Sequence, residues 1–212
     1  MTEVVETKRS RVARRQVDKF AERRAQLAAA ALHTLAELGY ARTSLREIAQ
    51  NSEFTHGVLH YYFSDKVELI THAVRQYEAV CVTRYDGIVE TATTADGLRQ
   101  DFGAAMANTL DIDAPLHRLW YDLRNQSLFE ESFRADVIEI DRRREQMIDN
   151  VVRRYADLSG RPLTVSSSTA YAVFDGLFQQ ALLHKLSGRA EAVDDLRAAA
   201  ADLLDLVTCD SP

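Results

Sequence analysis

Cysteine, proline, glycine and tryptophan are all scarce in this chain of 212 residues. It holds two Cys, three Pro, eight Gly and one Trp. The two cysteines lie far apart in the sequence, which excludes a disulfide-stapled scaffold and indicates a reducing compartment. Because prolines and glycines are few while Ala and Leu are plentiful, the composition favours helix throughout and predicts an all-α fold.

Long apolar runs and recognisable catalytic motifs are also missing. No apolar run approaches the roughly 20 residues needed to span a bilayer, and the charged N-terminus lacks the apolar segment of a signal peptide. We therefore expect no membrane partner and a cytoplasmic location. Without a nucleophile elbow, a glycine-rich phosphate loop or a short-spaced ligand set, we expect no enzyme, no cofactor and no metal.

Charge is unevenly distributed along the chain, although the net value is −6. Residues 1–66 hold eleven Lys and Arg against eight Asp and Glu, whereas residues 67–212 hold 15 against 24. A basic N-terminal third followed by an acidic remainder suits a protein that meets DNA with one end only.

The segment 43–66, TSLREIAQNSEFTHGVLHYYFSDK, predicts two short helices joined by a tight turn. Ser44 and Glu47 have the capping-box spacing at the start of the first helix, and Thr55 can cap the second. A short polar helix face held by a small apolar clamp suits the recognition helix of a helix-turn-helix unit, because the major groove admits one helix.

Particular residues in this segment carry a resemblance to a known family. They are REIA at 46–49, Gly57, Leu59, Tyr62–Phe63, Lys66 and the apolar pair at 69–70, preceded by Gly39–Tyr40 and Thr43–Ser44. On these residues, positions 17 to 75 resemble the DNA-binding domain of TetR/AcrR-family transcriptional regulators.

The segment departs from the family pattern at two positions. Glu53 stands in the turn where the family usually has Gly, so it must either bear a left-handed conformation or adopt another turn. His60 stands where the family often has Tyr.

The polar face and the resemblance together predict the DNA-contacting residues. Those meeting bases or nearby backbone would be Arg46, Thr55, His56, Gly57 and Tyr61. Those holding phosphates would be Thr43, His60, Tyr62 and Lys66, the last at a helix N-terminus where the dipole favours an anion. The four-residue spacing of His56 and His60 also suits a metal, but no third ligand is evident, so DNA contact is preferred.

Three regions and about nine helices are expected. Residues 1–17 form a flexible basic arm, either a solvated tail or a segment that reaches phosphates or the minor groove. Residues 18–65 form a three-helix DNA-binding domain, and residues 66–212 form a larger helical ligand-binding and dimerisation domain. Within the latter, a long helix from 66 to about 86 is predicted, and Pro115 is expected to begin a new helix. The charged run at 142–154 is interpreted as a solvated helix face.

A ligand site is expected among the aromatic residues of the C-terminal region, although these residues can equally well fill the core. Asp175 lies between apolar neighbours and needs a buried partner. The resemblance implies that a small organic effector binds here. The candidate residues are Phe102, Met106, His117, Trp120, Tyr121, Arg124, Phe174, Asp175 and Phe178.

The last two predicted helices, 164–187 and 191–207, carry excess apolar surface, which predicts a homodimer through a four-helix bundle. The resemblance implies the same arrangement. A twofold dimer would place two recognition helices about one DNA turn apart on a near-palindromic operator.

These inferences define two main hypotheses for function, and a third, an all-helical hydrolase, has no positive support in the sequence. The first is a ligand-responsive, sequence-specific DNA-binding transcriptional regulator, a repressor released from its operator by a small-molecule effector that shifts the dimer through the helix at 66–86. The alternative is a helical small-molecule-binding protein of the same fold with weak or lost DNA binding.

Overall fold

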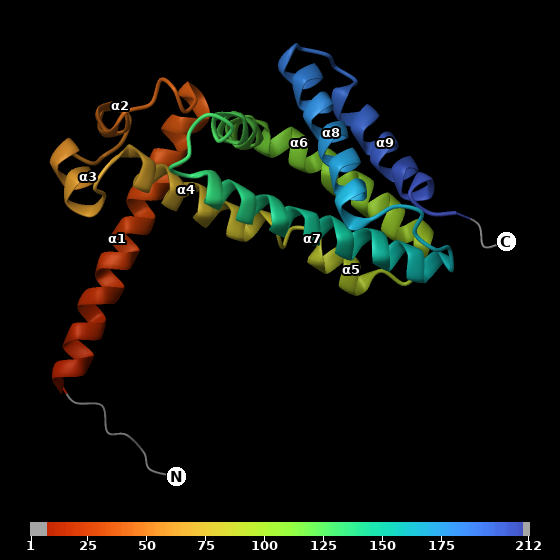
Figure 1. Ribbon diagram of the computed structural model, residues 1–212, viewed down its shortest axis with the longest axis horizontal. Helices are drawn as coiled ribbons and strands as arrows, with labels where there is room; N and C mark the ends of the chain where they lie inside the picture. The colour runs from red at the N-terminus through yellow and green to blue at the C-terminus, as the bar shows by residue number, and fades with distance from the viewer. Residues whose placement is uncertain (1–7, 210–212) are drawn as a thin grey trace, which may run out of the picture. The chain divides into compact units, whose positions relative to one another are not determined.

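The computed structural model describes residues 8–209, with side chains from residue 16 onward, and these residues form α-helices joined by short turns (Figure 1). No strand occurs in this part of the chain; one isolated antiparallel bridge joins Leu163 to Thr208. The nine described helices are α1 (Lys8–Leu38), α2 (Leu45–Gln50), α3 (His56–Tyr62), α4 (Lys66–Cys81), α5 (Asp86–Thr91), α6 (Ala95–Gln126), α7 (Arg134–Ser159), α8 (Ser167–Leu186) and α9 (Ala192–Leu206).

The all-helical prediction is confirmed, but the helix boundaries expected near residues 86 and 115 were wrong. The expected long helix ends at Cys81, because the Thr83 hydroxyl donates to the carbonyl of Val80 and competes with the helical ladder. Conversely, Pro115 lies inside the continuous helix α6 instead of starting a new one. A proline removes only one ladder bond, and the packed turns on either side hold the helix together. The two errors cancel in the helix count.

Helix α1 begins at Lys8, about ten residues before the predicted start. Residues 8–17 of the predicted basic arm therefore belong to a helix, in keeping with the good helix propensity of Arg, Ala and Gln. Residues 1–7 of that arm lie outside the described residues.

The chain divides into two compact units, at residues 1–76 and 77–212, and the boundary lies within α4. In the N-terminal unit, α1 to α4 enclose one apolar core, which fixes the positions of the two short helices. Its members are Leu27, Ala28, Ala31, Leu45, Ile48, Phe54, Leu59, Phe63, Leu69 and Ala73. Gly39, with φ of 77°, ends α1 as predicted, because the left-handed conformation favours glycine.

The C-terminal unit is built around α6, which packs against α7, α8 and α9, while α8 and α9 lie side by side (Figure 1). Gly103 allows the close approach of α6 and α9, since a Cβ atom there would lie 2.7 Å from the carbonyl oxygen of Arg197. Among the described residues, no helix has the length and apolarity needed to cross a membrane.

Candidate DNA-binding face and ligand cavity

Side-chain caps define both helices of the predicted helix-turn-helix. Ser44 and Glu47 form a complete capping box at the start of α2, in which the Ser44 amide donates to the Glu47 carboxylate over 2.9 Å. The Thr55 hydroxyl accepts from the Val58 amide at the start of α3. These caps fix where each short helix begins, as the sequence predicted.

The turn between α2 and α3 accommodates Glu53 without left-handed backbone. In the described part of the chain, positive φ angles occur only at glycines. The amide of Phe54 donates to the Ser52 hydroxyl, and the Phe54 ring is buried in the core beneath the turn. Of the two possibilities for Glu53, the structure shows the second, a different turn.

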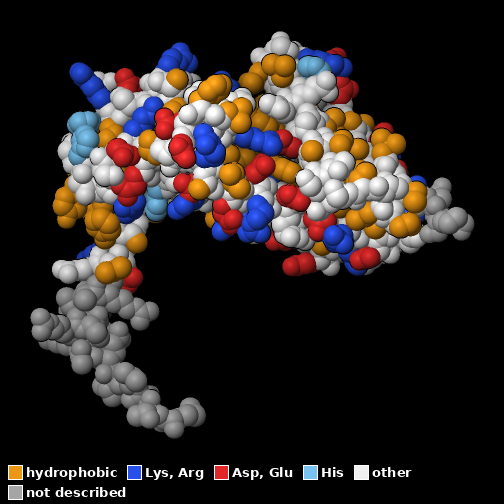
Figure 2. All heavy atoms as spheres, viewed as in Figure 1, with side chains coloured by type: hydrophobic (Ala, Val, Ile, Leu, Met, Phe, Trp, Pro, Cys, Tyr) orange, Lys and Arg blue, Asp and Glu red, His pale blue; other side chains and the backbone are white. Residues whose placement is uncertain are grey.

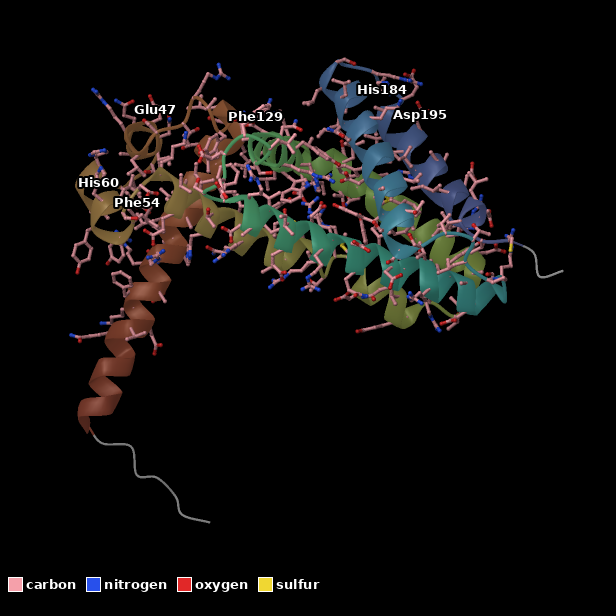
Figure 3. All side chains as sticks on the ribbon, in the orientation of Figure 1. Glu47, Phe54, His60, Phe129, His184 and Asp195 are labelled. Carbon is pink, nitrogen blue, oxygen red and sulfur yellow. The ribbon has the colours of Figure 1, made fainter. Side chains whose placement is uncertain are left out.

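Most of the predicted DNA-contacting residues form an exposed surface at α3 and the adjacent part of α2. We call this surface the α3 face. His60 lies on the outer side of α3, whereas Phe54 points toward the core (Figure 3). A Cβ atom at Gly57 would meet no atom of the described residues within 4 Å, so none of these neighbours requires glycine there. The exposed members are Arg46, Thr55, His56, Gly57, His60 and Tyr61.

The other three predicted contacts have internal partners in the structure. Thr43 is buried and its hydroxyl donates to the Gly39 carbonyl over 2.8 Å. The half-buried Tyr62 ring packs on Phe20 with centroids 4.7 Å apart. Lys66 donates through Nζ to the Tyr40 carbonyl over 2.6 Å. These three side chains therefore have partners within the N-terminal unit, and their predicted phosphate contacts stay predictions.

An ion pair braces the start of α4 against α1. Arg24 donates to Glu68 over 2.7 Å, and its guanidinium lies 4.3 Å from the Phe63 ring centroid. The Ser64 amide also donates to Glu68. The Ser64 amide and Arg24 lower the pKa of Glu68 from 4.5 to about 2. The chain segment after α3 is therefore held in one position relative to α1.

His56 and His60 contact one another, with ring centroids 4.4 Å apart in an edge arrangement. No cluster of three His, Cys, Asp or Glu side chains suited to a metal occurs within residues 16–209. His56 and His60 lie on the exposed face of a capped helix, a position that suits contact with another molecule.

A cavity lies within the C-terminal unit, enclosed by the end of α4, the residues that follow it, and α6, α7 and α8. The cavity volume is about 490 Å³, and this figure includes space that is open to solvent. Six of the nine predicted ligand-binding residues line it: Met106, His117, Tyr121, Phe174, Asp175 and Phe178.

The remaining three predicted residues lie outside the lining. Phe102 is fully buried and stacks edge-on against Tyr85 and Phe174. Trp120 is buried against the guanidinium of Arg144, 4.5 Å from its ring. The partly exposed Arg124 pairs with Asp175, and the buried Tyr121 donates to the same carboxylate through its hydroxyl over 3.0 Å, which supplies the buried partner expected for Asp175.

Sequence reasoning missed eight lining residues: Cys81, Arg84, Tyr85, Thr109, Arg144, Met147, Ile148 and Tyr171. The expectation of a solvated charged face on α7 was wrong for Arg144. This side chain is 7% exposed, and its guanidinium donates twice to Glu78, over 2.6 and 2.9 Å. No local signal marks such a residue, because its partner lies 66 positions away.

Burial and neighbouring charges alter the titration of the cavity lining. Burial, followed by the charges of Arg144 and Arg84, holds the pKa of His117 well below its usual value. Burial raises the pKa of Cys81 and, together with Asp175, the pKa of Tyr121. At neutral pH the cavity therefore presents a neutral imidazole, a thiol and protonated phenols.

Several large apolar side chains of the C-terminal unit are exposed on its last two helices. They are Val173, Leu183 and Leu186 of α8 and Leu206 of α9. Elsewhere the surface is mixed, and basic and acidic side chains lie interspersed on the face shown in Figure 2. On α7, for example, Arg142 and Arg143 both pair with Glu139.

Comparisons with known proteins agree with this arrangement. The family model for bacterial regulatory proteins of the tetR family matches residues 27–73. The HTH-type transcriptional regulator BetI of Burkholderia mallei is 31% identical over 119 residues, which cover 53% of this chain and 58% of BetI. The chain thus matches little more than half the length of this relative.

Solved structures share the fold at low sequence identity. A Saccharomonospora viridis protein in complex with choline has a TM-score of 0.74 at 17% identity, covering 90% of this chain and all of that one. The regulator FadR of Bacillus subtilis, in complex with stearoyl-CoA, has a TM-score of 0.67 at 16% identity, covering 84% and 96%.

Proposed function

Because the chain belongs to the TetR family of bacterial regulatory proteins, we propose that it is a sequence-specific DNA-binding transcriptional regulator that responds to a small organic ligand. The observation that carries the proposal is the α3 face. It combines a capped helix of seven residues with outward-facing His56, His60 and Tyr61, held over a closed apolar core. A helix of this kind suits entry into the major groove, where side chains near its N-terminus read base edges.

The exposed residues divide by the part of DNA they would meet. Thr55, His56 and Gly57 stand at the N-terminus of α3, where we propose contact with bases and the adjoining backbone. Arg46 on α2 and Tyr61 on α3 would also meet bases or the nearby backbone, and His60 would hold a phosphate. Gly57 would let the backbone come close to DNA, since no contact among the described residues explains the missing side chain.

A homodimer through α8 and α9 is the proposed assembly. These helices expose Leu183, Leu186 and Leu206, and apolar surface of this kind favours burial against a second copy. A twofold axis would present two α3 faces to half-sites about one DNA turn apart, so the operator should be nearly palindromic. Location in the cytoplasm, where the DNA of a bacterium lies, is part of the proposal.

Ligand control would act through α4. This helix begins beside the α3 face at Lys66 and ends at Cys81 in the cavity lining. Relatives of this fold hold choline or stearoyl-CoA. We propose that a ligand in the cavity favours a dimer whose half-site spacing no longer matches the operator, which makes the protein a repressor. Loss of DNA binding, the alternative function, is not favoured, because Glu53 sits in the turn without left-handed backbone.

The test is selection of duplexes from a random DNA pool by the purified protein at physiological salt. We expect enrichment of a near-palindrome. His56→Ala and Tyr61→Ala should each weaken binding to that duplex at least roughly fivefold, since a good base contact contributes about 1–3 kcal/mol.

The matched control is His33→Ala, which removes an exposed histidine of α1 that pairs with Glu37. It should bind the duplex as tightly as the unchanged protein. No enrichment by folded, ligand-stripped protein would contradict the proposed function. Equal effects of His33→Ala and His56→Ala would instead show that the α3 face is wrongly assigned.

A further inference from the structure

We infer that the cavity takes an uncharged, largely apolar organic ligand with one hydrogen-bond acceptor, which the Nδ1–H group of His117 binds. The inference rests on the proposed ligand-responsive function and deepens it by naming the chemical class of the ligand. Three observations carry it: an unpaired ring nitrogen, the compensation of every lining charge, and the apolar side chains that make up much of the remaining wall.

His117 is buried in the lining, and its Nδ1 atom has no hydrogen-bond partner among the described residues. Its Nε2 atom lies 3.5 Å from Nη1 of Arg84. A guanidinium can only donate, so Nε2 accepts, and the neutral ring carries its proton on Nδ1. Phe178 covers the ring at a centroid distance of 4.5 Å. A buried donor without an acceptor is destabilising. A ligand acceptor that bonds to Nδ1–H would therefore remove this cost and gain binding free energy.

The charged side chains of the lining are already compensated within the protein. Each of the three contacts a group of opposite charge outside the lining; the pairs are Arg84 with Asp113, Arg144 with Glu78, and Asp175 with Arg124. A charged ligand would lose its hydration and find no uncompensated counter-charge, which is strongly unfavourable.

One additional carboxylate lies near the cavity. Asp141 shares Arg124 at 3.5 Å and accepts from the Tyr171 hydroxyl over 2.6 Å. Its side chain is 32% exposed, so solvent screens its charge. Asp141 therefore offers a cationic ligand little stabilisation.

Much of the remaining wall offers apolar contact, and the hydroxyls of Tyr121 and Tyr171 already donate to Asp175 and Asp141. The apolar contact comes from Met106, Met147, Ile148, Phe174 and Phe178. Flat aromatic ligands suit such walls, because ring edges and methionine sulfurs contact aromatic faces favourably. The result is a site for a molecule with an aromatic or compact apolar body and a carbonyl-type acceptor.

Four probes of similar size test each element of the inference. Acetophenone is neutral and carries an acceptor; α-methylstyrene has the same shape without the acceptor; benzoate is an anion; phenyltrimethylammonium is a cation. Binding to the full chain, in the absence of DNA, is measured by ligand-observed NMR and calorimetry. We expect acetophenone to bind up to about tenfold more tightly than α-methylstyrene, and both ions to bind more weakly than acetophenone.

Two substitutions at one position locate the acceptor contact. His117→Asn keeps an amide nitrogen near the position of Nδ1, whereas His117→Gln places its amide near Nε2. The ratio of the two neutral probes' affinities should persist in His117→Asn and fall to about one in His117→Gln. Because the ratio is internal to each variant, a general loss of packing does not alter its meaning. Circular dichroism confirms that both variants fold.

Tighter binding of either ion than of acetophenone would overturn the inference. So would an acetophenone preference that survives in His117→Gln, or no binding of any probe at roughly 10 mM, a concentration that populates even millimolar sites. Failure of the DNA selection with this binding pattern intact would remove the proposed function and leave the ligand class standing. Successful DNA selection with a different order of probe affinities would support the proposed function and overturn the ligand class.

Discussion

The buried pair of Arg144 and Glu78 is the residue-scale feature with the largest energetic consequence. We predict that Arg144→Met or Glu78→Leu alone lowers the free energy of unfolding by about 3–5 kcal/mol, because each leaves an uncompensated buried charge. The double variant should recover most of that loss. The original protein, the two single variants and the double variant form a double-mutant cycle, and urea denaturation measures the free energy of unfolding of each.

The control for this cycle is Arg143→Ala. The pair of Arg143 with Glu139 is exposed, so this substitution should leave the urea midpoint nearly unchanged. Single variants at Arg144 and Glu78 that match this control would contradict the buried character of the pair.

Glu68 should make stability depend on pH in the acid range. Its folded-state pKa of about 2 lies below its ordinary value of 4.5, so its contribution is fully present above pH 4.5 and is lost as pH falls toward 2. We predict that Glu68→Gln flattens the pH dependence of the unfolding midpoint between these values. A slope unchanged from that of the original protein would show that Glu68 has no such role.

Residue patterns predicted the exposed positions of α3 better than the charged residues that line the cavity. The caps at Ser44 and Thr55 follow from local spacing, and local spacing also marks the exposed positions of α3. Arg84 and Arg144 escaped prediction, because a charged residue enters a core only where a distant chain segment supplies its partner. Thr43 was predicted to hold a phosphate but is buried, because its hydroxyl donates to the nearby carbonyl of Gly39.

At the scale of elements, Pro115 offers a direct test of helix α6. An interior proline lacks the amide that would donate to the carbonyl four residues earlier and is unfavourable in a helix by about 3 kcal/mol relative to Ala. We predict that Pro115→Ala raises the free energy of unfolding by about 1–3 kcal/mol, measured by urea denaturation. Ala114→Pro, one position earlier on a buried turn, should instead destabilise the protein. If Pro115→Ala and Ala114→Pro changed the free energy of unfolding in the same direction, the cost assigned to an interior proline would be wrong.

Periodicity and stop signals predicted most of the helices, and Gly39 ended its helix as expected, but α5 was missed and α6 was divided into two helices. The end of α4 at Cys81 and the continuity of α6 through Pro115 could not be predicted. A proline can stand at the start of a helix or inside one, and the local sequence is the same in both cases. Only the packing of the flanking turns decides which occurs.

At the scale of the whole molecule, the proposed dimer depends on the apolar surface of α8 and α9. We predict that Leu183→Asp combined with Leu206→Asp raises the dimer dissociation constant by roughly tenfold or more, as measured by sedimentation. Ile138→Asp changes an equally exposed apolar residue of α7 and serves as control. A dimer unaffected by the double variant would place the interface elsewhere.

The two thiols of the chain differ sharply in accessibility. Cys81 is buried in the cavity lining, whereas Cys209 is exposed near the end of the chain. A maleimide spin label applied to the folded protein would therefore react at Cys209 alone. In a twofold assembly that gives a single label-to-label distance, so the spread of the two C-terminal ends, with and without a bound molecule, becomes measurable in solution without altering any residue.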